Sequence, residues 1–202
     1  MTKKFILKQE QLFNTAASLF AEKGYHGTSI SDLAQAMGMR KGSLYHYFKS
    51  KEELLFRLLD EYITEALTEI ETICALEVTP PEKLRQFMLF YSSFYAGDRD
   101  RLVLLINDID KLGESYRLQV IEKERRYYRA LTGIFSQLQV AGIMKPIPPA
   151  VAAFAFFGMV HYTCKWFHKD GAITAEELSE MFLEIFTKGI FTESAKQLVP
   201  YA

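Results

Sequence analysis

Apolar residues recur along the chain at intervals of three and four positions, the pattern of helices that bury one face. In the first such segment, residues 3–22, Leu12, Ala16, Leu19 and Phe20 follow this spacing. The sequence contains no alternating apolar and polar run of useful length and no turn pair typical of a hairpin. It therefore predicts an all-α protein.

Glycine, proline and capping residues divide this pattern into segments of helical length. Capping boxes, in which a hydroxyl and an acid three residues later bind each other's amides, are predicted at Ser29–Asp32, Ser50–Glu53 and Thr174–Glu177. After the first segment we expect helices over residues 30–37, 40–47, 51–73, 81–95, 101–111, 114–140, 150–168 and 174–188.

Charge is unevenly spread along the chain. Residues 1–51 carry eight Lys and Arg residues against three acids, whereas the whole protein has a formal net charge of -1. A basic N-terminal quarter on a mildly acidic body predicts that one end of the molecule meets a polyanion.

Several classes of site are not indicated. Cys74 and Cys164 are isolated, which favours a reducing, cytoplasmic setting over a disulfide framework. The four histidines have no metal-ligand spacing, so we expect no metal and no cofactor. The longest apolar stretch, residues 150–164, is too short to cross a bilayer, so we expect no membrane partner.

The segment from Gly24 to Leu55 contains the most informative pattern. Two short predicted helices each present an apolar face and are separated by Gly38, which allows the left-handed backbone of a tight turn. Ala34 is small enough to let the two helices cross closely. These features predict a helix-turn-helix, whose second helix enters the major groove of DNA.

The outer face of the second helix carries groups that suit DNA. Lys41 can reach a guanine edge or a phosphate, Gly42 permits close backbone approach, and Ser43 and Tyr45 add hydroxyls. Flanking positions where phosphates would lie hold Thr28, Ser29, Tyr47 and Lys51. The alternative is a solvated basic face on an ordinary helical hairpin.

The run Leu44-Tyr45-His46-Tyr47-Phe48-Lys49-Ser50-Lys51-Glu52-Glu53-Leu54-Leu55 resembles the DNA-binding signature of the TetR family of bacterial regulators. The resemblance implies a homodimer in which residues 1–55 form a three-helix DNA-binding domain and residues 56–202 a helical ligand-sensing and dimerisation domain. It implies a repressor of a palindromic operator in double-stranded DNA. By the family's pattern the DNA contacts are Thr28, Ser29, Arg40, Lys41, Gly42, Ser43, Tyr45, His46, Tyr47 and Lys51.

Residues 150–189 are similar to members of the family that respond to acyl-CoA thioesters in fatty-acid and sterol catabolism. Aromatic side chains could line an apolar cavity, and arginines could meet the phosphates of a large anion. The predicted effector contacts are Phe90, Phe94, Arg101, Leu105, Arg125, Tyr128, Phe157, His161 and Trp166. The same rings could instead form the core or the dimer interface, and the arginines a solvated face.

Three other functions compete with an acyl-CoA-responsive repressor. An enzyme is disfavoured, because the motifs of nucleophilic, metal-dependent and phosphate-binding catalysis are missing from the sequence. The large domain could bind no ligand and serve only to dimerise or to dock a protein partner. The same repressor architecture could also sense a hydrophobic drug or an aromatic compound.

Overall fold

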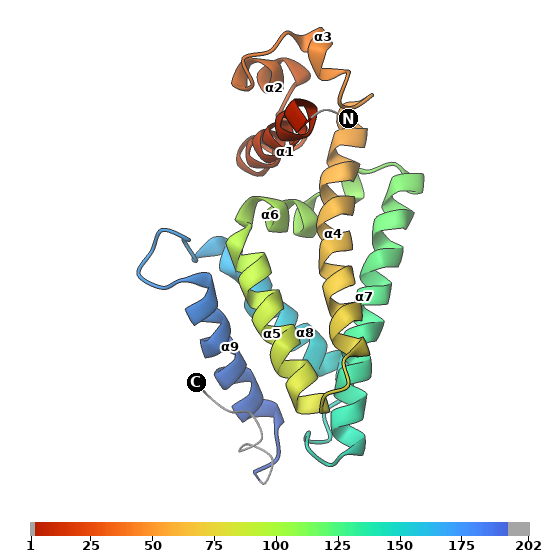
Figure 1. Ribbon diagram of the computed structural model, residues 1–202, viewed down its shortest axis with the longest axis vertical. Coiled ribbons are helices and arrows are strands. Elements are labelled where there is room, and N and C mark those ends of the chain that lie inside the picture. The colour runs from red at the N-terminus through yellow and green to blue at the C-terminus, as the bar shows by residue number, and fades with distance from the viewer. Residues whose placement is uncertain (1–2, 194–202) are drawn as a thin grey trace. The chain divides into compact units, whose positions relative to one another are not determined.

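The computed structural model describes residues 3–193 and confirms the all-α prediction (Figure 1). In this range the remaining regular pairing is one isolated antiparallel bridge between Met144 and Phe191. None of the described helices is both long enough and apolar enough to cross a membrane. The α-helices are α1 (Lys3–Lys23), α2 (Ile30–Ala36), α3 (Lys41–Leu44), α4 (Lys51–Ala75), α5 (Pro80–Gly97), α6 (Arg99–Asn107), α7 (Glu114–Val140), α8 (Pro149–His161) and α9 (Ala175–Ile190), with short 3-10 helices η1 (Ile109–Lys111) and η2 (Tyr162–Lys165).

The chain forms two compact units that do not follow its order. The first unit comprises residues up to 63 together with residues 100–122, and the second comprises residues 64–99 and those from 123 onward. Both α4 and α7 therefore contribute residues to each unit. A division into functional domains after residue 55 stays a prediction.

The core of the first unit is built from the apolar positions that the sequence pattern singled out. On α1, Leu12, Ala16 and Phe20 repeat every four residues and are buried, as an amphipathic helix requires. The other elements add fully or nearly fully buried side chains to this unit: Leu33 and Ala34 from α2, Leu44 from α3, Phe48, and Leu54, Leu55 and Leu58 from α4.

Two of the three predicted capping boxes are confirmed, at Ser29–Asp32 and at Thr174–Glu177. The third differs by one residue. Ser50 Oγ accepts the amide of Glu53 at 3.0 Å, but the Glu53 carboxylate accepts the amide of Lys49 at 2.7 Å, one residue before the position that a capping box uses. The acid thus satisfies an amide of the preceding turn.

Three predicted helices end earlier than expected, because their last turns tighten. The predicted helix over residues 40–47 keeps only the four residues of α3, and Tyr47 N then donates to Leu44 O over three residues at 2.9 Å. The expected helices over 101–111 and 150–168 likewise give way to η1 and η2.

The second unit has an aromatic core. Phe87, Tyr91 and Tyr95 lie four residues apart on α5, so they share one face of that helix, and all are buried. Within this unit α5 packs along α9 and against α8. Tyr127 and Phe135 of α7, Phe156 of α8, and Phe182 and Phe186 of α9 are also buried.

A strip of apolar side chains on α8 and α9 remains exposed in the single chain. Phe154 on α8 is 64% exposed and Ile185 on α9 is 63% exposed, and Val151, Tyr162 and Met181 are exposed as well. The small residues Ala152 and Ala153 instead point into the core, where their exposure is 2% and 0%. Val151 and Phe154 are three positions apart on α8, and Met181 and Ile185 four positions apart on α9, which marks one face of each helix, while Tyr162 follows α8 in η2.

The turn between α2 and α3 yields a stability prediction. Gly38 has φ +61°, which an alanine adopts only at a cost, so Gly38→Ala should lower the free energy of unfolding by about 1 kcal/mol. Gly133→Ala is the matched control, because Gly133 is exposed within α7 and a Cβ there would meet nothing. Gly133→Ala should raise the free energy of unfolding, measured by urea denaturation, by up to about 1 kcal/mol. Equal effects of the two substitutions would show that the backbone of Gly38 is not constrained.

Candidate nucleic-acid interface

Gly38 turns the chain sharply between α2 and α3. Its left-handed backbone allows Met39 N to donate to Ala34 O at 2.9 Å, which closes the end of α2 before α3 begins. Ala34 is 5% exposed and Leu33 and Leu44 are fully buried, so the two helices share a packed inner side. This is the helix-turn-helix geometry that the sequence predicts.

The outer side of α3 presents most of the residues that were predicted to contact DNA. Lys41 and Gly42 are exposed, and Ser43 is half-buried. Tyr45 is exposed although its ring lies 6.0 Å from that of the buried Phe48. Ser29, Arg40 and His46 are also exposed. The structure thus brings these polar groups to one end of the first unit, and their contact with DNA stays a prediction.

Thr28 is placed differently from the other predicted contacts. It is fully buried, and its hydroxyl donates to Leu19 O at 3.1 Å and to Gly24 O at 3.0 Å. The sequence pattern predicts that this hydroxyl lies at a phosphate. In the structure the Thr28 hydroxyl instead binds carbonyl oxygens of α1 and of the loop between α1 and α2, since a buried hydroxyl needs internal partners.

An acid already occupies the start of α2. The hydroxyl and the amide of Ser29 donate to Asp32 Oδ2 at 2.6 and 2.7 Å, and these bonds hold the pKa of the Asp32 carboxyl below its usual range. Because this carboxylate neutralises the helix terminus, Ser29 is less suited to a phosphate than the sequence implied.

Lys51 and Tyr47 turn partly inward. Lys51 Nζ donates to the carbonyl oxygens of Tyr25 and Thr28, each at 2.9 Å, and lies 4.4 Å from the centre of the Tyr25 ring. Tyr47 is half-buried, with its ring stacked 4.7 Å from that of Phe5 on α1.

The sequence analysis missed Arg57 on α4. Its Nη1 donates to Tyr47 O at 2.8 Å, and its guanidinium lies 4.7 Å from the centre of the Phe13 ring. An available signal was its position between Leu55 and Leu58 on the buried side of an amphipathic helix, where a lone arginine needs internal partners.

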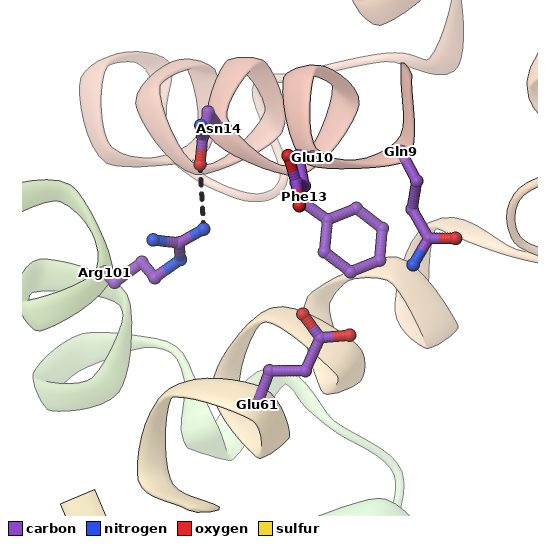
Figure 2. Close-up of a pocket in the computed structure, with 6 residues that line it drawn as sticks. All are labelled: Gln9, Glu10, Phe13, Asn14, Glu61 and Arg101. Carbon is purple, nitrogen blue, oxygen red and sulfur yellow. Dashed lines mark hydrogen bonds between the residues drawn. The ribbon is translucent and has the colours of Figure 1, made fainter. Parts of the chain in front are cut away.

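A small polar pocket of about 180 Å³ lies within the first unit, between α1, α4 and α6 (Figure 2). Arg101, which we had predicted as an effector contact, donates here to Asn14 Oδ1 at 2.8 Å. Burial raises the pKa of the Glu61 carboxyl, although Arg57 and Arg101 oppose the shift. The pocket is lined by Gln9, Glu10, Phe13, Asn14, Glu61 and Arg101.

The predicted effector contacts do not form one cluster. Arg101 and the buried Leu105 belong to the first unit, and the others belong to the second. Arg125 and Trp166 are exposed. Phe90 stacks on Phe94 at 5.1 Å, and Tyr128 lies 5.4 Å from Phe154. Both pairs adjoin the aromatic core, since Phe94 lies 5.2 Å from Tyr95 and Phe154 6.1 Å from Phe157.

Phe157 and His161 meet in the aromatic core of the second unit. Tyr91 Oη lies 2.5 Å from His161 Nε2, and the Phe157 ring stacks on both residues, at 5.2 and 5.8 Å. Burial lowers the pKa of His161 to about 4, so the imidazole is neutral near pH 7 and shares one hydrogen bond with the Tyr91 hydroxyl. This pair is the polar centre of the ring cluster.

Glu124 on α7 is a partly buried acid of the second unit. Burial raises the pKa of its carboxyl to about 6, and its charge adds to the burial that raises the pKa of Tyr95. The charge of this carboxyl therefore acts on a buried phenol of the ring cluster, a feature that the sequence alone did not reveal.

Comparisons with known proteins agree with this geometry. Residues 12–58 match the family model described as bacterial regulatory proteins of the tetR family, and residues 77–190 match a tetracyclin repressor-like C-terminal domain. The HTH-type transcriptional repressor KstR2 of Mycobacterium tuberculosis is 27% identical over 190 residues, which are 92% of this chain and 94% of that protein. The Fatty acid metabolism regulator protein of Bacillus subtilis is 27% identical over 91% of this chain and 95% of its own.

A solved structure is similar along almost its whole length. The crystal structure of AibR in complex with isovaleryl coenzyme A and operator DNA is 28% identical, with a TM-score of 0.75 over 88% of this chain and 97% of that one. These matches cover both units.

Lys41 generates a specificity prediction. Lys41→Ala should weaken binding to a duplex selected in vitro and relax preference at one base pair, with a loss of discrimination of about 1–3 kcal/mol. The measurement is fluorescence anisotropy on single-base variants of that duplex. Lys49→Ala, which removes an exposed lysine outside α3, should leave the ranking of the variants unchanged. An unaltered ranking with Lys41→Ala would exclude Lys41 from base recognition.

His161 generates a pH prediction. Its pKa of about 4 lies below the ordinary 6.5, so the unfolded chain binds more protons between these values. Stability from this residue is complete above pH 6.5 and falls toward pH 4, by up to about 3 kcal/mol. His161→Gln should flatten this dependence in urea unfolding, whereas the same change at the exposed His168 should not. Glu124 acts in the opposite direction in every variant and cancels in the comparison.

Proposed function

Because the chain belongs to the TetR family of bacterial regulators, we propose that it represses transcription as a dimer on a palindromic operator and is released by an acyl-CoA thioester. The observation that carries the DNA half of the proposal is the exposed polar side of α3, presented by the turn at Gly38. Lys41, Gly42, Ser43 and Tyr45 read the groove in this proposal. Arg40 and His46 lie beside them and meet the phosphate backbone.

The exposed apolar strip on α8 and α9 supports dimerisation. Phe154 and Ile185 are each more than half exposed, which is costly for large apolar side chains unless a partner covers them. A second copy with the same strip forms a self-complementary interface related by a twofold axis. Two copies then present two α3 helices, which explains a palindromic site.

The effector half of the proposal rests on the core of the second unit. Two relatives concern related compounds, since one is named a fatty acid metabolism regulator and another was solved with isovaleryl coenzyme A. Stacked rings suit an apolar acyl chain, and the neutral Tyr91–His161 pair suits an uncharged carbonyl better than a carboxylate. The exposed Arg125 on α7 is the proposed contact for phosphates outside the core.

The remaining effector contacts follow from this arrangement. Phe90, Phe94, Tyr128, Phe157 and Trp166 are proposed to receive the apolar part of the ligand, with His161 at its carbonyl. Arg101 and Leu105 belong to the first unit and are left out of this ligand site.

A hydrophobic drug or aromatic compound is the second candidate effector. The density of rings in the core favours it, since Phe87, Tyr91, Tyr127 and Phe156 lie within 6 Å of one another in several pairs. Such a compound would need neither a thioester nor the contact at Arg125.

The effector proposal is tested on the complex of the full chain with its selected operator. Acyl-CoA thioesters of graded chain length should release the duplex at micromolar concentrations, while coenzyme A alone and the matching free fatty acids should not. Sedimentation under the same conditions should show two chains per duplex. Tyr91→Phe should reduce the response to the thioester, because it removes the hydroxyl beside the proposed carbonyl. Release by aromatic amphiphiles alone would replace the acyl-CoA assignment with the second candidate.

A further inference from the structure

One acid interrupts the buried stripe of α7 in the second unit. Tyr127, Leu131, Ile134 and Leu138 follow one another at intervals of three and four residues, and each is at most 4% exposed. Glu124 precedes Tyr127 by three residues, so it lies on the same face of the helix. An ionised group on a face that packs into a core is costly unless it is paired. Glu124 therefore occupies a position that packing alone would give to an apolar side chain.

No cation neutralises this carboxylate among the side chains that the structure describes. The positions three and four residues away on α7 hold Val120, Ile121, Tyr127 and Tyr128, which carry no positive charge. Burial is the sole cause that raises the pKa of the Glu124 carboxyl to about 6, and no neighbouring cation opposes it. Near pH 7 the carboxyl is consequently still mostly ionised.

The negative charge of Glu124 acts on the polar centre of the aromatic core. It adds to the burial that raises the pKa of Tyr95, a phenol that is 1% exposed. The centre of the Tyr95 ring lies 4.2 Å from that of Tyr91 and 5.6 Å from that of His161. The carbonyl site proposed above, at Tyr91 and His161, therefore lies within the negative potential of Glu124.

We propose that Glu124 selects the effector by charge: it excludes ligands whose buried end is a carboxylate and admits those whose buried end is neutral or cationic. This inference rests on the proposed function, which places the polar end of the effector at Tyr91 and His161. A thioester is then accepted, and the free fatty acid of the same chain length is rejected inside the core. The rejection does not depend on what the ligand carries outside the core.

Two other groups could account for a preference for thioesters over free acids. The Tyr91–His161 pair favours an uncharged carbonyl through its hydrogen bonds. The exposed Arg125 would favour a ligand that carries phosphates outside the core. A negative charge is distinguished from both because its removal shifts the affinities for an amine and for a carboxylate in opposite directions.

The test measures the direct binding of octylamine, octanamide and octanoate to the full chain by calorimetry near pH 7, without DNA. These three ligands have similar chains, lack phosphates, and carry a positive, a neutral and a negative head. We expect the unaltered protein to bind octanoate about 10- to 100-fold more weakly than octanamide. This factor corresponds to the repulsion of two unit charges about 6–10 Å apart at an effective dielectric constant of about 20.

Glu124→Gln removes the charge and keeps the size of the side chain. It should raise the affinity for octanoate by about the same factor, lower that for octylamine, and leave that for octanamide unchanged. Glu124→Asp keeps the charge and should retain the order of the three ligands. The matched control is Glu122→Gln, which removes an exposed acid two residues earlier on another face of α7 and should change no affinity.

Three results would overturn the proposal. If Glu124→Gln leaves the ratio of the octanoate and octanamide affinities unchanged, hydrogen bonding is responsible for the selectivity. If it weakens all three ligands alike, Glu124 is a structural residue. A protein that binds no octanamide has no acyl site for Glu124 to guard. Failure of the proposed function is measured separately, as a failure of acyl-CoA thioesters to release the duplex, in which these three ligands take no part.

Discussion

The inner side shared by α2 and α3 is the contact on which the rest of the first unit depends. Leu33, Ala34 and Leu44 are buried there, so the polar faces of both short helices must point outward. Burial alone fixes which side of α3 is exposed but not its direction, since a few apolar contacts permit rotation. Lys51 and Arg57 of the longer helix α4 add directional hydrogen bonds to main-chain oxygens before α2 and after α3.

The second unit combines a large apolar core with a small number of polar groups that have to be matched. The Tyr91 hydroxyl and the His161 imidazole hydrogen-bond to each other amid stacked rings. Burial of these two polar groups therefore costs little free energy while the pair is intact. Separation of the pair without replacement would strand a donor and an acceptor in an apolar setting. An effector that enters must therefore offer its own polar atom, which gives this core a basis for choosing among ligands.

The sequence predicted the fold better than the roles of individual side chains. Helix ends and caps depend on neighbouring residues in the chain, so the sequence predicts the break at Gly38, the start of α5 to within one residue, and the caps at Ser29 and Thr174. The burial of Thr28, the inward path of the Lys51 side chain and the bond of Arg101 to Asn14 depend on residues from 4 to 87 positions away. A long cationic side chain has the same sequence signature whether it extends to solvent or folds back.

Trp166 is the sole tryptophan of the chain, and it lies in the second unit with its indole 6.0 Å from the Phe167 ring and 45% exposed. Fluorescence excited at wavelengths that only tryptophan absorbs consequently reports on the second unit alone. Unfolding confined to the helix-turn-helix would leave this emission unchanged, because the first unit holds no tryptophan. The tyrosines, by contrast, are spread over both units, so their absorbance reports on the molecule as a whole.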